Sequence, residues 1–297
     1  MTKPSCDPDA GLEFAPVDVG QGRRLFACRF AAQGPSRGTV LFDAGTFGLY
    51  ADGYWLGHYL SAQGYDVVSY SRAGLYPSDP VPDGEVPNPF FHAEDMVRLL
   101  DALKIGGRII LTGHSMAGLR LHAFAKTHAD RLRALFFIDA VMPVQLGWTV
   151  RRDMVRGGAP MLSLGARGAP TVLGRTFARL YPNIMQLPGR ARTDKSACWT
   201  MPSHLTGTQV ETLATVDQAL QASLGPLPDI AVGAVTATAV ATGTKEMIQR
   251  AADRGLPTRF EHIPRAGHAD LLAPRHAERI AALIHDLAEQ ERATSSH

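Results

Sequence analysis

The sequence predicts an α/β fold in which a mostly parallel central sheet carries helices on both faces. Short runs of apolar and β-branched residues alternate along the chain with stretches of helical spacing, which is the pattern of repeated strand and helix units. The 297 residues are 45% hydrophobic and 20% charged, so the chain has the composition of a globular protein with a large core. The length alone allows one large domain or two small ones.

The first part of the chain predicts an antiparallel opening followed by parallel strands. Residues 12–19 and 25–30 predict a hairpin, because a Gly-Gln-Gly turn separates them. Residues 39–42 form a compact apolar run that predicts a buried strand, and residues 65–70 predict the next strand. Between these two strands, residues 53–62 place aromatic and leucine side chains at helical spacing.

The middle of the chain continues the alternation on both sides of a serine. Residues 93–104 carry apolar side chains at positions i, i+3, i+4 and i+7, which predicts an amphipathic helix. Residues 108–112 predict a strand, residues 116–127 a helix and residues 132–138 another strand. The residue between the first of these strands and the helix after it is Ser115.

A long insertion then interrupts the pattern. Over residues 141–228 the alternation gives way to helical pieces separated by Gly and Pro. Structureless loops longer than about 15 residues are uncommon in compact domains. We therefore expect residues 141–228 to form a helical cap, and residues 1–140 together with 229–297 to form the core.

The end of the chain returns to the strand and helix pattern. Residues 237–241 and 259–263 predict the last two strands. Residues 271–289 carry an apolar stripe at helical spacing and predict a final helix.

Charge is distributed unevenly along the chain. The formal net charge of +2 does not suggest a nucleic-acid-binding protein. Residues 151–195, however, contain nine Lys or Arg and only two Asp. This basic island raises the hypothesis that anionic substrates are steered to the cap, and the alternative is an ordinary solvated helical surface.

Several kinds of site lack the residues they need. The sequence has no His-Glu-x-x-His pair, no cysteine quartet, no Walker A sequence and no Asp-rich calcium loop. Cys6, Cys28 and Cys198 are widely spaced and are expected to be free, mostly buried thiols. No run of about 18 apolar residues occurs, and the N-terminal residues have no apolar leader segment. We expect a cytoplasmic protein that acts on a small molecule without a cofactor, a metal, a nucleic-acid partner or membrane insertion, and its oligomeric state is not indicated.

The serine has the surroundings of a nucleophile. Gly113-His114-Ser115-Met116-Ala117 follows a strand and opens a helix, which is the context that gives the Gly-x-Ser-x-Gly turn its chemical meaning. Small residues two places on either side of the serine permit a tight turn that exposes the hydroxyl. Ala117 replaces the last glycine of the pattern, and Gly118 follows it. The competing interpretation is a serine that only caps a buried helix.

These residues, with others along the chain, resemble the α/β-hydrolase family over about residues 25–287. Residues 71–74 with Ser78 resemble that family's Asp-x-Arg-Gly-x-Gly-x-Ser loop, residues 93–103 its helix before the nucleophile, and Gly267-His268 its histidine loop. The resemblance implies an α/β-hydrolase fold and the chain order serine, acid, histidine. Ser rather than Asp at the turn argues against the epoxide hydrolases and haloalkane dehalogenases of this fold, which use a carboxylate nucleophile.

The base and the acid of the site differ in how clearly they are indicated. A serine hydroxyl needs a general base, and His268 follows a late predicted strand through a short turn, so we assign it that role. His114 is adjacent to the serine but points the wrong way, and is expected to be a packing residue. For the acid we favour Glu246, which stands near the position implied by the family resemblance, with Asp139 at the end of another strand as the alternative.

The resemblance also implies an oxyanion hole built from two backbone amides. Met116 follows the nucleophile, and Thr46 follows the glycine of an earlier loop, with Phe47 a further possibility. Asp43 precedes that loop, and a carboxylate beside a developing oxyanion would be harmful. We expect its side chain to turn away and to form hydrogen bonds with the backbone.

Together these residues predict a serine esterase that hydrolyses a small, partly apolar substrate through an acyl-enzyme on Ser115. Two alternatives stay open. One is a ligand-binding member of the family without catalysis, and the other is a lyase or C–C bond hydrolase that uses the same serine and histidine.

Overall fold

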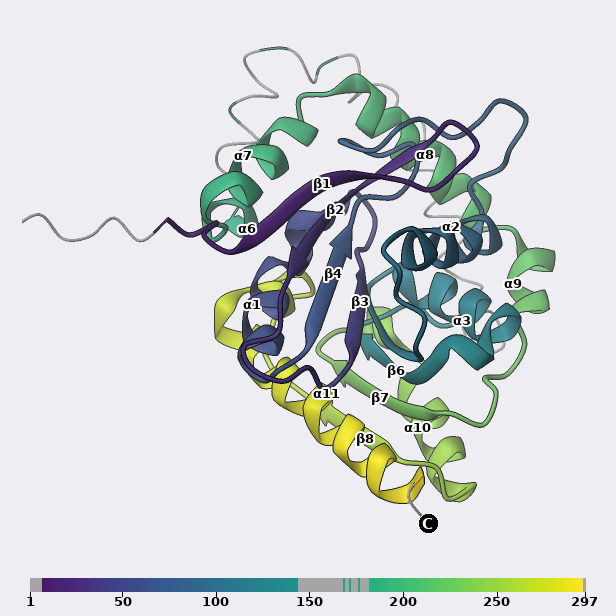
Figure 1. Cartoon of the computed structure of the whole chain (residues 1–297). Coiled ribbons are helices and arrows are strands. Elements are labelled where there is room, and N and C mark those ends of the chain that lie inside the picture. The colour runs from purple at the N-terminus through teal and green to yellow at the C-terminus, as the bar shows by residue number, and fades with distance from the viewer. Residues whose placement is uncertain (1–6, 144–167, 169–170, 172–175, 177–181, 296–297) are drawn as a thin grey trace, which may run out of the picture.

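A single eight-stranded sheet organises the molecule (Figure 1). The computed structural model describes residues 7–143, 168, 171, 176 and 182–295. The strand order is β1-β2-β4-β3-β5-β6-β7-β8, with β1 and β2 antiparallel to their neighbours and the remaining pairs parallel. The strands are β1 (Leu12–Asp18), β2 (Arg24–Phe30), β3 (Thr39–Asp43), β4 (Asp66–Tyr70), β5 (Ile109–His114), β6 (Leu132–Ile138), β7 (Ala231–Thr236) and β8 (Thr258–His262). The predicted mostly parallel sheet with an antiparallel opening is confirmed.

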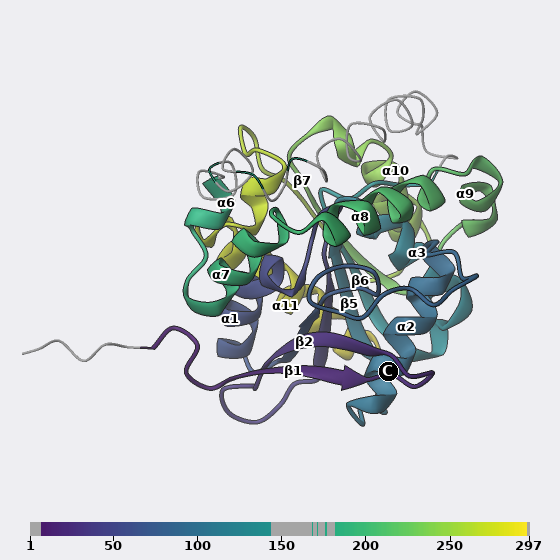
Figure 2. The same cartoon turned by 90° about the horizontal axis from the view of Figure 1, so that it is seen from above.

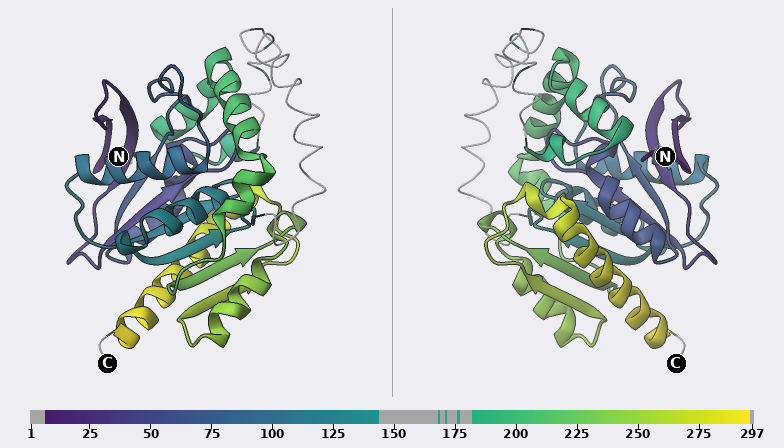
Figure 3. Two further views of the ribbon diagram at one scale, coloured as in Figure 1. Left: turned by 90° about the vertical axis from the view of Figure 1, so that its right-hand side faces the viewer. Right: turned by 90° about the vertical axis from the view of Figure 1, so that its left-hand side faces the viewer.

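Helices cover both faces of the sheet. Helices α1 and α11 lie against one face, and α2, α3 and α10 lie against the other (Figures 1 and 3). Their bounds are α1 (Tyr54–Ala62), α2 (Pro89–Ala102), α3 (Ala117–Thr127), α10 (Thr244–Asp253) and α11 (Pro274–Ser295). Helix α2 begins at Pro89 rather than at residue 93, because the Asn88 side chain accepts hydrogen bonds from two amides of its first turn.

The core consists of two apolar layers separated by the sheet. Along β3, Leu41 packs with the layer under α2 and α3, whereas Val40 and Phe42 pack with the layer under α1 and α11. All three side chains have 0% of their surface exposed. Because side chains alternate across a strand, a parallel strand covered on both sides is apolar throughout its length, which explains the continuous apolar runs in the sequence.

Strand β7 is where the predicted element positions are wrong. The strand spans Ala231–Thr236, and residues 239–241 of the predicted strand form a short 3-10 helix instead. Gly233 lies inside the strand and weakens its sequence signal. Its place there has a packing reason, because a Cβ at this position would lie 2.6 Å from the Phe136 ring and 3.1 Å from Leu287 of α11.

Four described helices lie between β6 and β7. They are α6 (Pro182–Met185), α7 (Gly189–Cys198), α8 (Pro202–Thr215) and α9 (Gln218–Leu224). Figure 2 shows α7 beside α1 and α9 beside α3, with α8 between them. Cys28 and Cys198 are free and buried, as predicted, whereas Cys6 lies outside the described residues. None of the described helices combines the length and the apolar character needed to cross a membrane.

Candidate active site

Ser115 occupies a strained turn between β5 and α3. Its φ of 59° lies in the left-handed region, which costs a residue with a side chain about 1–3 kcal/mol. Backbone hydrogen bonds hold the turn in place: the Ser115 carbonyl accepts from the amides of Gly118 at 3.1 Å and Val141 at 2.8 Å, and the Ser115 amide donates to Ile138 at 3.2 Å. These hydrogen bonds hold the backbone in its left-handed conformation, which exposes the hydroxyl above the sheet.

Close approach explains the small residues around this turn. A Cβ on Gly113 would lie 2.6 Å from the Cβ of Ala117, so the turn has room for one methyl group of the two, and Ala117 supplies it. A Cβ on Gly118 would lie 2.1 Å from the Val141 carbonyl oxygen. The departure from the usual glycine at position 117 is thus compatible with the turn, and Gly118 is needed for a separate contact.

His268 and Asp139 form a hydrogen-bonded pair. The Nδ1 atom of His268 lies 2.6 Å from Oδ2 of Asp139. Asp139 is fully buried and also accepts hydrogen bonds from the Ala237 amide at 2.9 Å, the Thr238 amide at 3.0 Å and the Thr238 hydroxyl at 2.6 Å. Burial alone would raise the pKa of Asp139, but the hydrogen bonds from His268, Ala237 and Thr238 lower it to about 2. The carboxylate is therefore ionised and fixed against one nitrogen of the imidazole.

Ser115 and His268 line the same cavity, which has a volume of about 240 Å³. His268 is 31% exposed, so its ring is open to this cavity while its Nδ1 faces the buried carboxylate. Phe47 and Trp199 form another part of the wall and stack with their ring centroids 5.0 Å apart. The cavity thus combines a hydroxyl, an imidazole and an aromatic surface.

The structure brings Asp139, and not Glu246, to the imidazole. Glu246 lies in the first turn of α10, where its side chain is exposed. Among the described residues it has no hydrogen bond or ion pair with His268. The preference for Glu246 is therefore corrected. It depended on a strand over residues 237–241, and since β7 ends at Thr236, Glu246 falls a helical turn beyond the loop that contacts Asp139.

The two predicted oxyanion donors lie next to the serine. Thr46 lines the cavity, and Met116 precedes the first residue of α3. Among the described residues, neither backbone amide has a hydrogen-bond partner. The loop is a tight turn closed by the Gly48 amide, which donates to the Gly45 carbonyl at 3.0 Å, with Phe47 at a φ of 60°. A Cβ on Gly45 would lie 2.8 Å from the Cβ of Ser115, so glycine lets this loop approach the serine.

His114 packs against the histidine rather than against the serine hydroxyl. Its ring lies 4.4 Å from the His268 ring, and its Nε2 donates to the His268 backbone carbonyl at 3.0 Å. Burial, together with the nearby His268, lowers the pKa of His114 to about 3. The predicted packing role agrees with this geometry, which leaves a neutral imidazole supporting the loop that carries His268.

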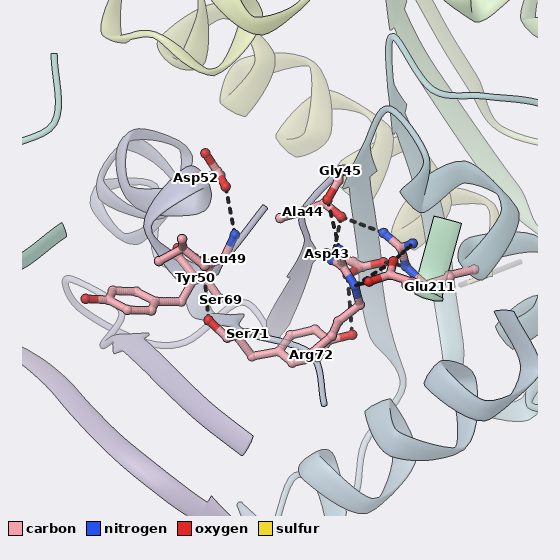
Figure 4. Close-up of polar contacts among 12 residues, drawn as sticks. Asp43, Ala44, Gly45, Leu49, Tyr50, Asp52, Ser69, Ser71, Arg72 and Glu211 are labelled. Carbon is pink, nitrogen blue, oxygen red and sulfur yellow. Dashed lines mark hydrogen bonds and ion pairs between the residues drawn. The ribbon is translucent and has the colours of Figure 1, made fainter. Parts of the chain in front are cut away.

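Asp43 turns away from the cavity, but its partners differ from those expected. Its carboxylate accepts hydrogen bonds from Arg72 at 3.0 Å and from Arg120 at 2.5 Å, rather than from the backbone. Glu211 of α8 binds both arginines, at 3.1 Å and 2.7 Å, which completes the cluster shown in Figure 4. Arg72 lies in the loop that resembles a family motif, and Asp43 precedes the predicted oxyanion loop, whereas Arg120 and Glu211 belong to no such motif. Arg120 lies between Leu119 and Leu121 in a mostly apolar stretch of α3, and a charge in such a place is the signal that could have identified it.

Polar contacts also join α7 to the core beside the cavity. The Lys195 ammonium donates to Asp52 at 2.7 Å and to the Phe47 carbonyl at 3.1 Å, and it lines the cavity. Asp194 accepts hydrogen bonds from the hydroxyls of Tyr50 and Tyr76. Most of the basic island lies outside the described residues, and Lys195 is a described member of it that contacts the cavity.

A metal site needs several ligating side chains in one place. Among the described residues, no three or more His, Cys, Asp or Glu side chains gather in a way that could hold a metal ion. His268 and Asp139 form a pair with each other, and the other buried carboxylate near the serine, Asp43, is bound by guanidinium groups.

Comparisons with known proteins agree with the fold. A sequence model described as the "Alpha/beta hydrolase family" matches residues 24–283. An esterase from Thermogutta terrifontis, solved with malate bound, has a TM-score of 0.66 and 19% identity, with 94% of this chain and 99% of that chain covered. An epoxide hydrolase from Vigna radiata has a TM-score of 0.71 and 17% identity, with the same coverage of 94% and 99%. No curated protein matches the sequence. Identities this low show a shared fold alone.

Proposed function

This chain belongs to the α/β-hydrolase family and is an α/β-hydrolase enzyme, and on that premise we propose that it hydrolyses a carboxylic ester, or a related acyl bond, through an acyl-enzyme on Ser115. The observation that carries the proposal is the shared cavity of Ser115 and His268, with Nδ1 of that histidine 2.6 Å from the buried Asp139. A nucleophile, a base and a carboxylate that orients the base are the parts that acyl transfer needs.

Each member of this triad has a distinct part in the reaction. Asp139 accepts a hydrogen bond from the protonated Nδ1 of His268. The other ring nitrogen, Nε2, is then free to take the proton from the Ser115 hydroxyl. The freed oxygen attacks the acyl carbonyl, and the protonated imidazole then gives its proton to the departing alcohol. Water, activated by the same nitrogen, releases the acid and restores Ser115. The carboxylate stabilises the imidazolium that forms in both steps.

Two backbone amides are suited to stabilise the tetrahedral intermediate. The Thr46 and Met116 amides lack partners among the described residues and lie on the two sides of the serine, one on the loop after β3 and one at the start of α3. Fixed amide donors of this kind stabilise a developing oxyanion without reorganisation, and losing one costs about 100- to 1,000-fold in kcat. The positive end of the α3 dipole adds to the same effect.

The cavity indicates the kind of substrate. A volume of about 240 Å³ with Phe47 and Trp199 in its wall suits a small, partly apolar acyl group. We also propose that residues 141–228 form a cap domain on a core of residues 1–140 and 229–297, since α6 to α9 are inserted between β6 and β7. Lys195, from α7, brings the cap to the wall of the cavity.

Epoxide hydrolysis is not favoured, although an epoxide hydrolase shares the fold. Opening an epoxide on this fold uses a carboxylate nucleophile at the turn after β5, and that position holds Ser115. Of the two buried aspartates near the serine, Asp43 is bound by two arginines and Asp139 by His268. Neither carboxylate is placed to attack a substrate.

Labelling by a fluorophosphonate probe tests the proposal directly. We expect the wild-type chain to be labelled at Ser115 and to hydrolyse short-chain p-nitrophenyl esters, and Ser115→Ala to lose both properties while keeping its unfolding temperature. Ser203→Ala, which changes an exposed serine of α8, is the matched control and should retain both. A wild-type chain that is neither labelled nor active, or a Ser115→Ala variant with full activity, would overturn the proposal.

A further inference from the structure

Four charged side chains meet in the interior next to the candidate oxyanion loop. Asp43, Arg72, Arg120 and Glu211, the arginine cluster, are exposed by only 0%, 1%, 0% and 6%. They come from the end of β3, the loop after β4, helix α3 and helix α8. Burying four charges is costly unless every one is paired, and here each carboxylate is bound by both guanidinium groups. Because the burial of four charges is costly, we ask what this cluster does beside the serine.

The arginines of the cluster also form hydrogen bonds with the backbone of the loop that carries Thr46. Arg72 donates through Nη2 to the Gly45 carbonyl at 2.9 Å and through Nη1 to the Ala44 carbonyl at 2.7 Å. Arg120 donates through Nη2 to the same Ala44 carbonyl at 2.5 Å. Figure 4 shows dashed lines that join the Ala44 and Gly45 carbonyls to guanidinium nitrogens. Two consecutive peptide groups are therefore fixed from the interior by cationic donors.

On this basis, and resting on the proposed hydrolase function, we propose that the arginine cluster positions the oxyanion hole by holding the Gly45 carbonyl, so that the Thr46 amide is aimed at the cavity. The Gly45 carbonyl and the Thr46 N–H belong to one planar trans peptide group, in which the two bonds point in opposite directions. Anchoring the oxygen on the interior side therefore fixes the N–H on the opposite side, where Thr46 lines the cavity.

Charge on the donor strengthens this effect. Hydrogen bonds from an ionised donor are roughly twice as strong as those between neutral groups. A hydrogen bond accepted by the carbonyl also polarises the peptide group, which makes its N–H a better donor, by about 10–30% in condensed-phase estimates. Burial by itself lowers the pKa of Arg72, but Glu211 and Asp43 raise it above its ordinary value, so the donor stays charged at every working pH.

The acidic members keep the cluster from disturbing the reaction. Two arginines and one aspartate would leave a net positive charge in the interior, and Glu211 brings the balance to zero. Glu211 lies on α8, within the inserted helices. The docking of α8 is therefore part of what completes the anchor behind Thr46, so this helix is joined to the catalytic geometry rather than only covering it.

A purely structural role for the cluster is the competing explanation, and the chain contains a matched control for it. Arg23 and Asp95 form a second buried pair, bidentate at 2.6 Å and 2.7 Å, with both residues 4% exposed or less. This pair joins the turn before β2 to α2, and neither residue lines the cavity or forms a hydrogen bond with the oxyanion loop in the described part of the chain. Replacing its arginine by lysine should cost a comparable amount of stability without touching the site.

The experiment compares Arg72→Lys with Arg23→Lys in the full chain. Lysine keeps the charge, but its three donors come from a single nitrogen, whereas Arg72 binds four acceptors, namely Asp43, Glu211 and the two carbonyls. We expect Arg72→Lys to lower kcat for a p-nitrophenyl ester about 10- to 100-fold with little change in KM, and to weaken an alkyl boronic acid, which mimics the oxyanion, by the same factor. Arg23→Lys should leave kcat, KM and boronic acid affinity near the wild-type values.

Amide hydrogen exchange over residues 43–49 provides a readout that does not need activity. Faster exchange of this segment in Arg72→Lys alone is the expected result. Equal kcat in the two variants at the same folded fraction, or a change confined to KM, overturns the proposal. If the wild-type chain is not labelled at Ser115, the proposed hydrolase function is wrong, and the anchoring of the loop is then tested by hydrogen exchange alone. Unchanged exchange of residues 43–49 in Arg72→Lys would overturn the anchoring.

Discussion

Two buried aspartates occupy similar places on either side of the nucleophile strand. Strands β3 and β6 flank β5 in the sheet, and Asp43 ends the first while Asp139 follows the second. Both side chains are 0% exposed. The loop after Asp43 lines the cavity around Ser115, and Asp139 binds His268, which lines the same cavity. The local position of the two carboxylates is therefore nearly the same.

Their partners are different, and the partners decide what each carboxylate can do. Asp43 is bound by two guanidinium groups, which remain charged at all working pH values, so its surroundings do not change during a reaction. Asp139 is bound by the imidazole of His268, whose ring is 31% exposed and can accept a proton from the cavity. One carboxylate thus serves a fixed anchor, and the other can stabilise a charge that appears and disappears.

The largest expected effect is the loss of activity when Asp139 is replaced. In Asp139→Asn, the side-chain amide can still accept from Thr238 but would present N–H to Nδ1 of His268, which forces the wrong tautomer. We expect kcat for a p-nitrophenyl ester to fall about 10,000-fold while the chain stays folded. Steady-state kinetics and circular dichroism measure the two quantities.

Glu246→Gln is the matched control for this substitution, because it neutralises an exposed carboxylate at the position that the sequence favoured. It should leave kcat within about twofold of wild type, as most surface substitutions do. If Glu246→Gln costs as much activity as Asp139→Asn, the assignment of Asp139 is wrong. A loss below tenfold in Asp139→Asn would also contradict it.

The second-largest effect is a loss of stability when Asp43 is replaced. Asp43→Asn leaves Arg72 and Arg120 with only Glu211 as a buried counter-charge, and an uncompensated buried charge costs about 3–5 kcal/mol. Urea unfolding at neutral pH should show a loss of that size, larger than the loss of about 2 kcal/mol expected for Asp139→Asn. Similar losses in the two variants would mean that the partners do not distinguish the two carboxylates as we argue.

The sequence predicted the fold because the fold depends on local patterns. Apolar runs such as residues 39–42 mark strands covered on both faces, and the turn around Ser115 needs small residues that the sequence displays. Strand β7 was misplaced because Gly233 weakens its signal, although the reason for that glycine is a tertiary contact with Phe136. The error shifted the loop that follows and led to the preference for Glu246.

The arginine cluster shows what the sequence could not supply. Asp43, Arg120 and Glu211 are far apart along the chain, and their meeting depends on how β3, α3 and α8 pack. The sequence indicates that Asp43 turns away from the cavity, but it does not indicate that the partners of Asp43 are arginines. A buried position for Arg120 could be suspected from its apolar neighbours in α3, but its partners could not be read from any spacing.

A smaller effect concerns pH. The pKa of Asp139 is lowered from 3.8 to about 2, so this group contributes stability that is complete above about pH 4 and is lost as the pH falls through 2. The full contribution is about 2 kcal/mol. The difference in unfolding free energy between wild type and Asp139→Asn should therefore shrink as the pH is lowered from 6 to 3. A difference that stays constant over this range would show that the hydrogen bonds do not favour the ionised form.

The smallest effect sharpens how Asp139 is held. Thr238 donates its hydroxyl to Oδ2 of Asp139 at 2.6 Å, the same oxygen that faces His268, and Thr238→Val removes this bond while keeping the shape of the side chain. A hydrogen bond to a charged group contributes about 1.5–3 kcal/mol, and the two amide donors that remain should reduce the loss to about 1 kcal/mol, or roughly fivefold in kcat.

Thr242→Val, an exposed threonine whose hydroxyl donates to the Ala239 carbonyl at 2.7 Å, is the matched control and should leave kcat unchanged. The pKa of Asp139 should rise in Thr238→Val, because one of the bonds that favour the carboxylate is gone. Equal kinetics in the two valine variants would show that the amides alone orient the carboxylate.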